Sequence, residues 1–291
     1  MIIFSLPDYR YLLSSFERSK NFQPGKYATE RFENKTLLLF IKTKVSGESC
    51  VVIGGSAPDA DLIETLLLCH TLKKEGAKKV TAILPFIPYA RQDKNKKGES
   101  WGADWLGKLC ASSGIDRVIT LDIHSQAAAR FPIPVLSLSP AFALVEKIKK
   151  EIAADAVCVA PDEGAIDNCM VLNRALKNET AIVFFKKKRS QRGVQMLSLK
   201  GEIGSDVVVA DDILDTGETM VRACEKLRDA GVKKITVVVT HGLFSSSKWK
   251  RLFRLGVRKI YCTDSHPGAR RIASSKIRVV SVGKIIADSL L

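Results

Sequence analysis

The sequence predicts an α/β protein of two similar halves, each a mostly parallel sheet flanked by helices. Short apolar runs alternate with amphipathic helical segments along nearly the whole chain, which is typical of parallel α/β architecture. Two segments of the first half recur in the second half. At 291 residues, the chain is long enough for two domains that each bury a core.

The expected strands are short apolar runs rich in β-branched residues, as in parallel strands that are buried on both faces. They cover 50–53, 80–85, 118–121, 157–160, 181–185, 207–210, 235–239 and 259–263. Helical patterns fall between them, for example at 61–74 and 218–229.

The internal repeat and one connector define the expected domains. The matching pairs are GAKKVTAIL with GVKKITVVV, and GIDRVITLDIH with GVRKIYCTDSH. Their offsets of 155 and 142 residues differ by 13, and the polar loop 89–101 is the candidate insertion in the first half. We place the boundary in the proline-containing stretch FPIPVLSLSP, which gives domains 1–139 and 140–291.

The composition favours a cytoplasmic protein that binds small anions. The net charge of +15 suits polyanionic ligands, but few aromatic residues interleave with the cations, so we expect no nucleic-acid partner. The sequence shows no signal peptide and no apolar run of membrane-spanning length, so we expect no membrane association. The seven cysteines show no zinc spacing, and we expect buried thiols in a reducing compartment.

The segment VVVADDILDTGET predicts a binding site for a sugar phosphate. Asp211 and Asp212 follow an apolar run, at the sheet edge where α/β proteins place ligands. Thr216, Gly217 and Thr219 lie at the start of the next helix, whose N–H groups and dipole favour an anion. The two acids can bond ribose hydroxyls or a divalent cation.

Other polar residues stand near strand ends. Arg91 and Gln92 in the inserted loop are planar donors suited to polyphosphate oxygens or a base edge, with a solvated basic loop as the alternative. The side chains of Asp122 and His124 fall on one side of an extended chain. They could share a metal ion, or they could be hydrogen-bonded polar residues without a ligand. The cationic run 186–189 can close over a transferring group.

Together these residues resemble the ribose-phosphate diphosphokinase family over nearly the whole chain, and most closely its short, archaeal-type members. The matching motifs are PFIPYARQD, LDIHSQ, APDEG, the KKKR segment, VVVADDILDTGET and VVVTHGLFS. The resemblance implies two duplicated phosphoribosyltransferase-like domains, with an ATP-binding loop in the first and a ribose 5-phosphate loop in the second. It also implies that the β,γ-diphosphoryl group of ATP passes to the anomeric hydroxyl of ribose 5-phosphate, with Mg²⁺, in a homo-oligomer.

The resemblance also implies a role for individual residues. Lys187 and Arg189 would stabilise charge on the transferred group, and His124 and Asp162 would bind magnesium. The residues implied at ATP are Phe32, Asn34, Thr36, Arg91, Gln92 and Asp93. Those implied at ribose 5-phosphate are Asp211, Asp212, Asp215, Thr216, Gly217 and Thr219.

Three departures from the family pattern bear on function. Glu218 stands beside Gly217 where the family usually has a second glycine; facing outward its charge suits the helix start, whereas facing inward it opposes the substrate phosphate. Asn34 and Thr36 replace two acids that recognise adenine, which bears on nucleotide selectivity. KNKKGES replaces a long regulatory segment, so we expect weak regulation by phosphate or ADP, or none.

Two other functions fit parts of this pattern. A phosphoribosyltransferase shares the acid pair and the Thr-Gly loop but consumes the diphosphate instead of making it. A non-catalytic regulatory homologue would keep the fold and bind active chains. The duplication argues against the first, and the retained Lys187, Arg189 and acid pair argue against the second.

Overall fold

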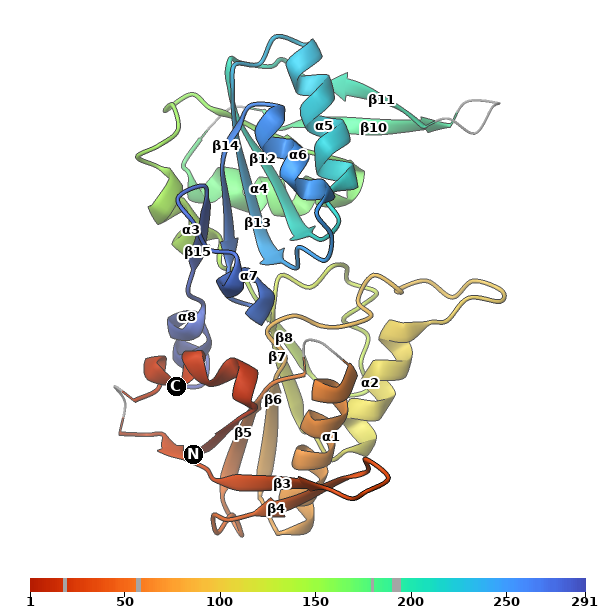
Figure 1. The fold of residues 1–291 in the computed structure, drawn as a ribbon, viewed down its shortest axis with the longest axis vertical. Coiled ribbons are helices and arrows are strands. Elements are labelled where there is room, and N and C mark those ends of the chain that lie inside the picture. The colour runs from red at the N-terminus through yellow and green to blue at the C-terminus, as the bar shows by residue number, and fades with distance from the viewer. Residues whose placement is uncertain (18–19, 56–58, 179–180, 190–194) are drawn as a thin grey trace. The chain divides into compact units, whose positions relative to one another are not determined.

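The computed structural model describes residues 1–17, 20–55, 59–178, 181–189 and 195–291, without the side chains of 187–189 and 195–198. The chain divides into two compact units (Figure 1). The first is Met1–Leu138 with Gly283–Leu291, and the second is Ser139–Val282.

The expected second domain, 140–291, is too long at its C-terminal end. Helix α8 (Gly283–Asp288) belongs to the first unit, where it contacts the 3-10 helix η1 (Pro7–Ser15). A Cβ atom on Gly283 would lie 2.2 Å from Ser15 Oγ, and Ile286 is buried. The last helix therefore completes the core of the first unit.

Within the described residues, the first unit holds a six-stranded parallel sheet in the order β2-β1-β5-β6-β7-β8. The strands are β1 (Ile2–Ser5), β2 (Gln23–Pro24), β5 (Ser49–Ile53), β6 (Lys79–Ile83), β7 (Arg117–Leu121) and β8 (Val135–Leu138). An antiparallel hairpin is formed by β3 (Tyr27–Arg31) and β4 (Leu37–Ile41). The helices are α1 (Asp59–Lys74), which contacts β4, β5 and β6, and α2 (Gly102–Ser112).

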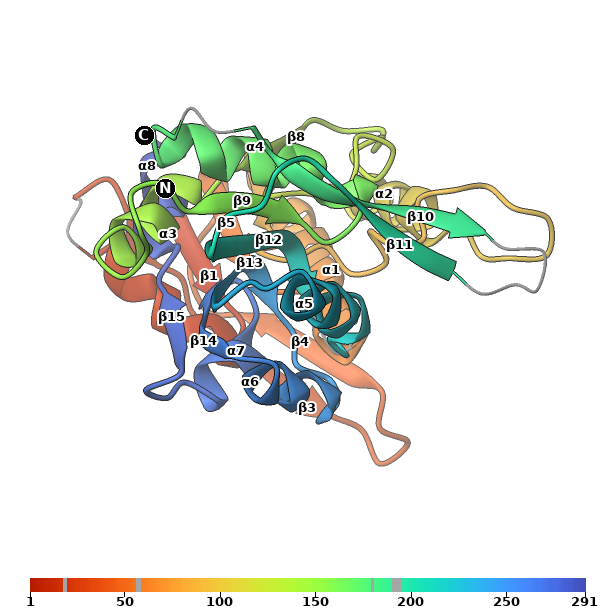
Figure 2. The same cartoon turned by 90° about the horizontal axis from the view of Figure 1, so that it is seen from above.

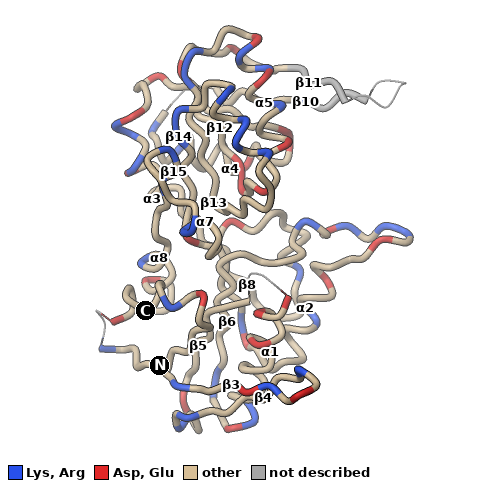
Figure 3. The backbone as a smooth tube through the Cα atoms, viewed as in Figure 1, with Lys and Arg blue, Asp and Glu red and all other residues tan. Residues whose placement is uncertain are grey.

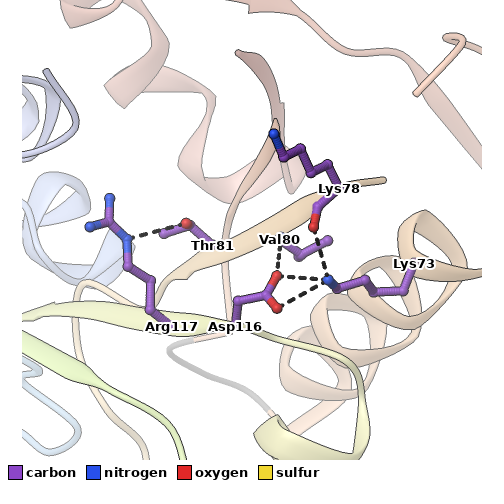
Figure 4. A network of polar contacts seen from close by, with 6 residues as sticks. All are labelled: Lys73, Lys78, Val80, Thr81, Asp116 and Arg117. Atoms are coloured by element: carbon purple, nitrogen blue, oxygen red, sulfur yellow. Dashed lines mark hydrogen bonds and ion pairs between the residues drawn. The ribbon is translucent and has the colours of Figure 1, made fainter. Parts of the chain in front are cut away.

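A charged network joins the N-terminal ends of β6 and β7 to α1 (Figure 4). The Asp116 carboxylate accepts from the Val80 N–H at 2.6 Å and pairs with Lys73 Nζ at 2.8 Å. Arg117 Nε donates to Thr81 Oγ1 at 3.3 Å. These bonds satisfy polar groups at the edge of the sheet opposite to its carboxyl ends, so this network is structural.

The second unit holds a seven-stranded sheet in the order β11-β10-β9-β12-β13-β14-β15, within the described part of the chain. All its pairs are parallel except the β10–β11 hairpin. The strands are β9 (Val157–Ala160), β10 (Val183–Arg189), β11 (Gln195–Lys200), β12 (Asp206–Leu214), β13 (Lys234–Gly242), β14 (Val257–Thr263) and β15 (Ile277–Val280).

Helices cover both faces of this second sheet, as Figure 1 and Figure 2 show. On one face, α5 (Glu218–Asp229) and α6 (Arg251–Arg254) pack in a core that includes Val207 and Val209. On the other, α3 (Ala141–Ile148) and α4 (Ile166–Ala175) pack in a core that includes Val208 and Ala210. The remaining short helices are η2 (Glu163–Ala165), η3 (Lys248–Lys250) and α7 (Pro267–Arg271). The predicted class, mostly parallel α/β sheets flanked by helices, is confirmed.

The strands β10, β12 and β13 extend beyond their expected ends. The run expected at 207–210 continues as β12 to Leu214, because β13 also continues and pairs Leu214 with Gly242. The run expected at 181–185 is shifted, since β10 begins at Val183 and includes the cationic residues to Arg189. The antiparallel partner β11 provides hydrogen bonds for this extension.

The polar and sulfur-containing residues follow the predicted pattern. All seven cysteines are buried and carry free thiols. In each unit Lys and Arg are interspersed with Asp and Glu instead of forming one stripe (Figure 3). No helix in the described segments has the length and apolar character that crossing a membrane requires.

Candidate functional site

The loop between β12 and α5 has a conformation that only glycine adopts easily. Gly217 is the residue before α5, with φ of +87°. A Cβ at this position would lie 2.8 Å from the Cα of Trp249 and 2.7 Å from its Cβ. Backbone conformation and close packing therefore both require glycine here.

The first turn of α5 is available for an anion. Thr216 and Gly217 precede the helix, and Thr219 lies in its first turn. The first N–H groups of a helix have no intrahelical partner, and the helix dipole makes this end positive. The Thr216 Oγ1 hydroxyl lies 3.5 Å from the Glu218 N–H. Such a helix start suits an anion, and the phosphate cradle at this loop stays a prediction.

The acid pair lies in the extended part of β12, before this loop. Asp212 is 5% exposed, Asp211 is half-buried, and the Asp212 N–H donates to Asp211 Oδ1 at 2.9 Å. Burial raises the pKa of the Asp211 carboxyl well above its usual range, and the charges of Asp212 and Asp162 act in the same direction. Three acids thus gather where a sugar hydroxyl or a cation would relieve their repulsion.

Strand order brings Asp162 and the cationic run to the same edge. Asp162 follows β9, which pairs with β12 on one side and β10 on the other. Its carboxylate accepts from the Gly164 N–H at 3.0 Å and begins η2. Because β10 pairs with β9 only at Val183 and Phe184, its residues to Arg189 run past the carboxyl end of β9 (Figure 2). The side chains of Lys187 and Arg189 lie outside the described part of the chain.

In the first unit, one open cavity of about 450 Å³ collects the predicted donor residues. Its lining residues are Arg91, Gln92, Asp93, Lys94, Lys96, Glu99, Ser100 and His124. The inserted loop and the segment after β7 therefore meet at one place. The surplus of cations suits a polyphosphate.

Hydrogen bonds hold the walls of this cavity. Ser125 Oγ donates to Asp93 Oδ2 at 2.6 Å, and Ser100 Oγ donates to Gln92 Oε1, also at 2.6 Å. Tyr89 adopts a φ of +62° and its hydroxyl donates to Asp59 Oδ1 at 2.5 Å. Sequence reasoning missed Ser125 and Asp59, and only the LDIHSQ motif pointed to Ser125.

The remaining predicted ATP residues lie elsewhere in the first unit. Phe32, Asn34 and Thr36 are exposed in the turn between β3 and β4. Asn34 Oδ1 accepts from the Thr36 N–H at 3.0 Å, which shapes the turn. Among the described residues, none of these three lines the cavity that contains Arg91.

The predicted metal ligands are distributed over both units. His124 lies in the first unit, and Asp162 lies in the second. Among the described residues, no group of three or more His, Cys, Asp or Glu side chains could hold a metal ion.

We expect Gly217→Ala to weaken the binding of ribose 5-phosphate and to lower the free energy of unfolding by roughly 1–3 kcal/mol. The methyl group would collide with Trp249 and strain a backbone with positive φ. Calorimetric titration and chemical denaturation measure the two effects. Gly231→Ala is the control, since Gly231 also has φ of +87° but has no atom within 4 Å of a built Cβ. Equal binding by both variants would contradict the expected role of this loop.

Comparison with known proteins finds similarity across the whole chain. Residues 1–114 match the family model described as the N-terminal domain of ribose phosphate pyrophosphokinase. Residues 149–291 match the model described as the phosphoribosyl synthetase-associated domain.

Individual relatives agree with these matches. Ribose-phosphate pyrophosphokinase A of Dictyostelium discoideum is 30% identical over 97% of this chain and 91% of its own length. The ribose-phosphate pyrophosphokinase of Agrobacterium fabrum is 30% identical over 100% of this chain and 96% of its own length. The crystal structure of phosphoribosylpyrophosphate synthetase from Mycobacterium smegmatis has a TM-score of 0.89 and 27% identity, and covers 99% of this chain and 97% of that one.

Proposed function

Because the chain belongs to the ribose-phosphate pyrophosphokinase family, we propose that it makes 5-phosphoribosyl 1-diphosphate and AMP from ATP and ribose 5-phosphate. The β,γ-diphosphoryl group of ATP passes to the anomeric hydroxyl of the sugar. The observation that carries this proposal is the similarity in fold over 99% of the chain, with a TM-score of 0.89. Both duplicated, phosphoribosyltransferase-like halves of the enzyme are therefore present.

The second unit provides the acceptor site in this proposal. The N–H groups at the start of α5, with Thr216 and Thr219, bind the 5-phosphate. Asp211 and Asp212 accept hydrogen bonds from the ribose hydroxyls. Burial raises the pKa of Asp211, and hydrogen bonds from the ribose hydroxyls would stabilise its ionised form.

The first unit provides the donor site. Arg91 and Gln92 contribute donors to the ATP, and the bond from Ser125 fixes Asp93 in the same wall. Phe32, Asn34 and Thr36 stay a prediction for the nucleotide base.

Magnesium is the proposed cofactor. In the second unit, Asp162 with Asp211 and Asp212 supplies the hard oxygen atoms that Mg²⁺ prefers. His124, which lies in the first unit, stays a predicted ligand. When bound, Mg²⁺ neutralises charge on the phosphate oxygens. Burial, with the charges of Asp212 and Asp162, raises the pKa of Asp211, and a nearby cation would offset this cost of its ionised form.

Transfer itself requires positioning and charge stabilisation, without a covalent enzyme intermediate. We propose that Lys187 and Arg189 on the β10–β11 hairpin approach the transferred group and stabilise the negative charge that develops on it. Each such cation lowers the barrier by roughly 3 kcal/mol, by analogy with single oxyanion donors. The support is the path of β10, which runs past the end of β9 beside Asp162.

The cellular setting follows from the same chemistry. We place the protein in the cytoplasm, where a reducing environment suits seven buried free thiols. A homo-oligomer of at least two subunits stays a prediction, as does the absence of nucleic-acid and membrane partners.

The identity of the nucleotide product tests the proposed function. Purified protein with ATP, ribose 5-phosphate and Mg²⁺ is expected to release AMP in equal amount with the diphosphorylated sugar. ADP as product would mean simple phosphorylation and would refute the proposal. Consumption of 5-phosphoribosyl 1-diphosphate with a base would indicate a phosphoribosyltransferase, and inactivity without a second type of chain would indicate a regulatory homologue.

A further inference from the structure

The segment Ser245–Trp249 lies against the phosphate loop and contacts it repeatedly. Ser245 Oγ donates to a carboxylate oxygen of Asp215, and Ser246 Oγ donates to the Thr216 carbonyl at 3.3 Å. The backbone of Trp249 closes off the space beside Gly217. The 3-10 helix η3, which begins at Lys248 within this segment, also contacts α5. A side chain of this segment can therefore act on the loop directly.

Glu218 brings a negative charge to the helix end that is proposed to bind a phosphate. It is the first residue of α5, one position after Gly217. A carboxylate here interacts favourably with the helix dipole but repels a phosphate dianion bound to the same N–H groups. Without a counter-charge, the chain would weaken its own acceptor site.

Lys248 supplies that counter-charge. Its Nζ lies 2.5 Å from Glu218 Oε1, and the two side chains are 61% and 51% exposed. The hydrogen bond from Lys248 lowers the pKa of Glu218, with smaller help from Arg222. Glu218 therefore faces outward, into an open hollow that Lys248 and Arg222 also line.

We infer that Lys248 is a positioning residue for the ribose 5-phosphate site, which it keeps receptive by neutralising Glu218 and holding its side chain outside the phosphate cradle. The inference rests on the proposed function and deepens it. It assigns to Lys248 an effect on sugar-phosphate affinity and none on the transfer step, because the Lys248 ammonium pairs with Glu218 at the loop.

A double-mutant cycle tests this inference. We expect Lys248→Ala to raise the Kd and KM for ribose 5-phosphate about two- to fivefold, with kcat nearly unchanged and a larger effect at low ionic strength. Adding Glu218→Gln to this variant should restore wild-type affinity, because the unpaired charge is then gone. A merely structural role for Lys248 would give no such rescue.

Lys226→Ala is the matched control. It removes the same charge from α5 and breaks the ion pair with Asp229, about 12 Å along the helix from Glu218. We expect this variant to bind like the wild type. Wild-type affinity in Lys248→Ala, or equally weak binding in the Lys248→Ala, Glu218→Gln double variant, would overturn the inference.

Calorimetric titration with ribose 5-phosphate alone separates this inference from the proposed function. A wild-type protein that binds the sugar phosphate but forms no AMP would refute the proposed function, while the comparison of Kd values would still decide the role of Lys248. A wild-type protein that does not bind the sugar phosphate would overturn both.

Discussion

Lys187→Ala is expected to form AMP about 100- to 1000-fold more slowly than the wild type, while its affinity for ribose 5-phosphate changes little. The proposed role of Lys187 is to stabilise charge on the diphosphoryl group during transfer, after both substrates have bound. Its loss should therefore lower kcat and leave the Kd for the sugar phosphate nearly unchanged. Rapid-quench measurement of AMP and calorimetric titration provide the two values.

The matched control for this prediction is Lys200→Ala. Lys200 is an exposed cation of the same hairpin, paired in register with Phe184 at the end that adjoins the sheet. The Lys200→Ala substitution removes an equal charge from β11 without changing a residue of the proposed site. If Lys187→Ala and Lys200→Ala turned over at the same rate, Lys187 would have no part in transfer.

Asp211→Asn is expected to reduce kcat/KM for ribose 5-phosphate about 100-fold and to leave the fold as stable as, or more stable than, the wild type. Asp211 is proposed to accept hydrogen bonds from the ribose hydroxyls, and an amide provides one acceptor oxygen in place of two. Stability should not suffer, because burial and two neighbouring acids already disfavour the ionised Asp211. If Asp211 were needed for the fold instead, Asp211→Asn would lower the free energy of unfolding and change kcat/KM little.

The pH dependence of stability provides an independent check on Asp211. Its folded pKa is raised, so the folded state binds this proton more tightly than the unfolded state does. The contribution of protonated Asp211 to the free energy of unfolding is therefore lost as the pH rises from the unfolded-state pKa of about 3.9 towards the folded-state pKa.

Chemical denaturation at several pH values measures this contribution. Any stability gain of Asp211→Asn over the wild type should be largest at neutral pH and should shrink as the pH is lowered. Asp229→Asn, at the exposed end of α5, is the control. A gain that grew on acidification would contradict the assigned direction of the shift.

Much of the second unit could be predicted from sequence because its signals are local. β-Branched runs fixed the positions of β9 and the first part of β12, and the Thr-Gly loop marked the start of α5. The extension of β12 to Leu214 depends on pairing with β13, which no local pattern reveals. The same limit applies to α8, whose contacts lie with η1 at the other end of the chain.

In the candidate site too, local features could be predicted from the sequence, whereas contacts between distant segments could not. Sequence identified Gly217, but the atoms that exclude a side chain there belong to Trp249, 32 positions later. It left the direction of Glu218 open, and the ion pair with Lys248 shows that this side chain faces outward. The bond from Ser125 to Asp93 likewise joins loops that only the folded sheet brings together.

The most direct test of the central claim is the fate of the β-phosphorus of ATP. With ATP labelled at that atom, ribose 5-phosphate and Mg²⁺, we expect the label to appear in the diphosphorylated sugar, together with unlabelled AMP. This result would show that the β- and γ-phosphoryl groups move as one unit. Label that stayed in ADP, or in unreacted ATP while the sugar phosphate was unchanged, would contradict the assignment of this chain as a diphosphoryl transfer enzyme.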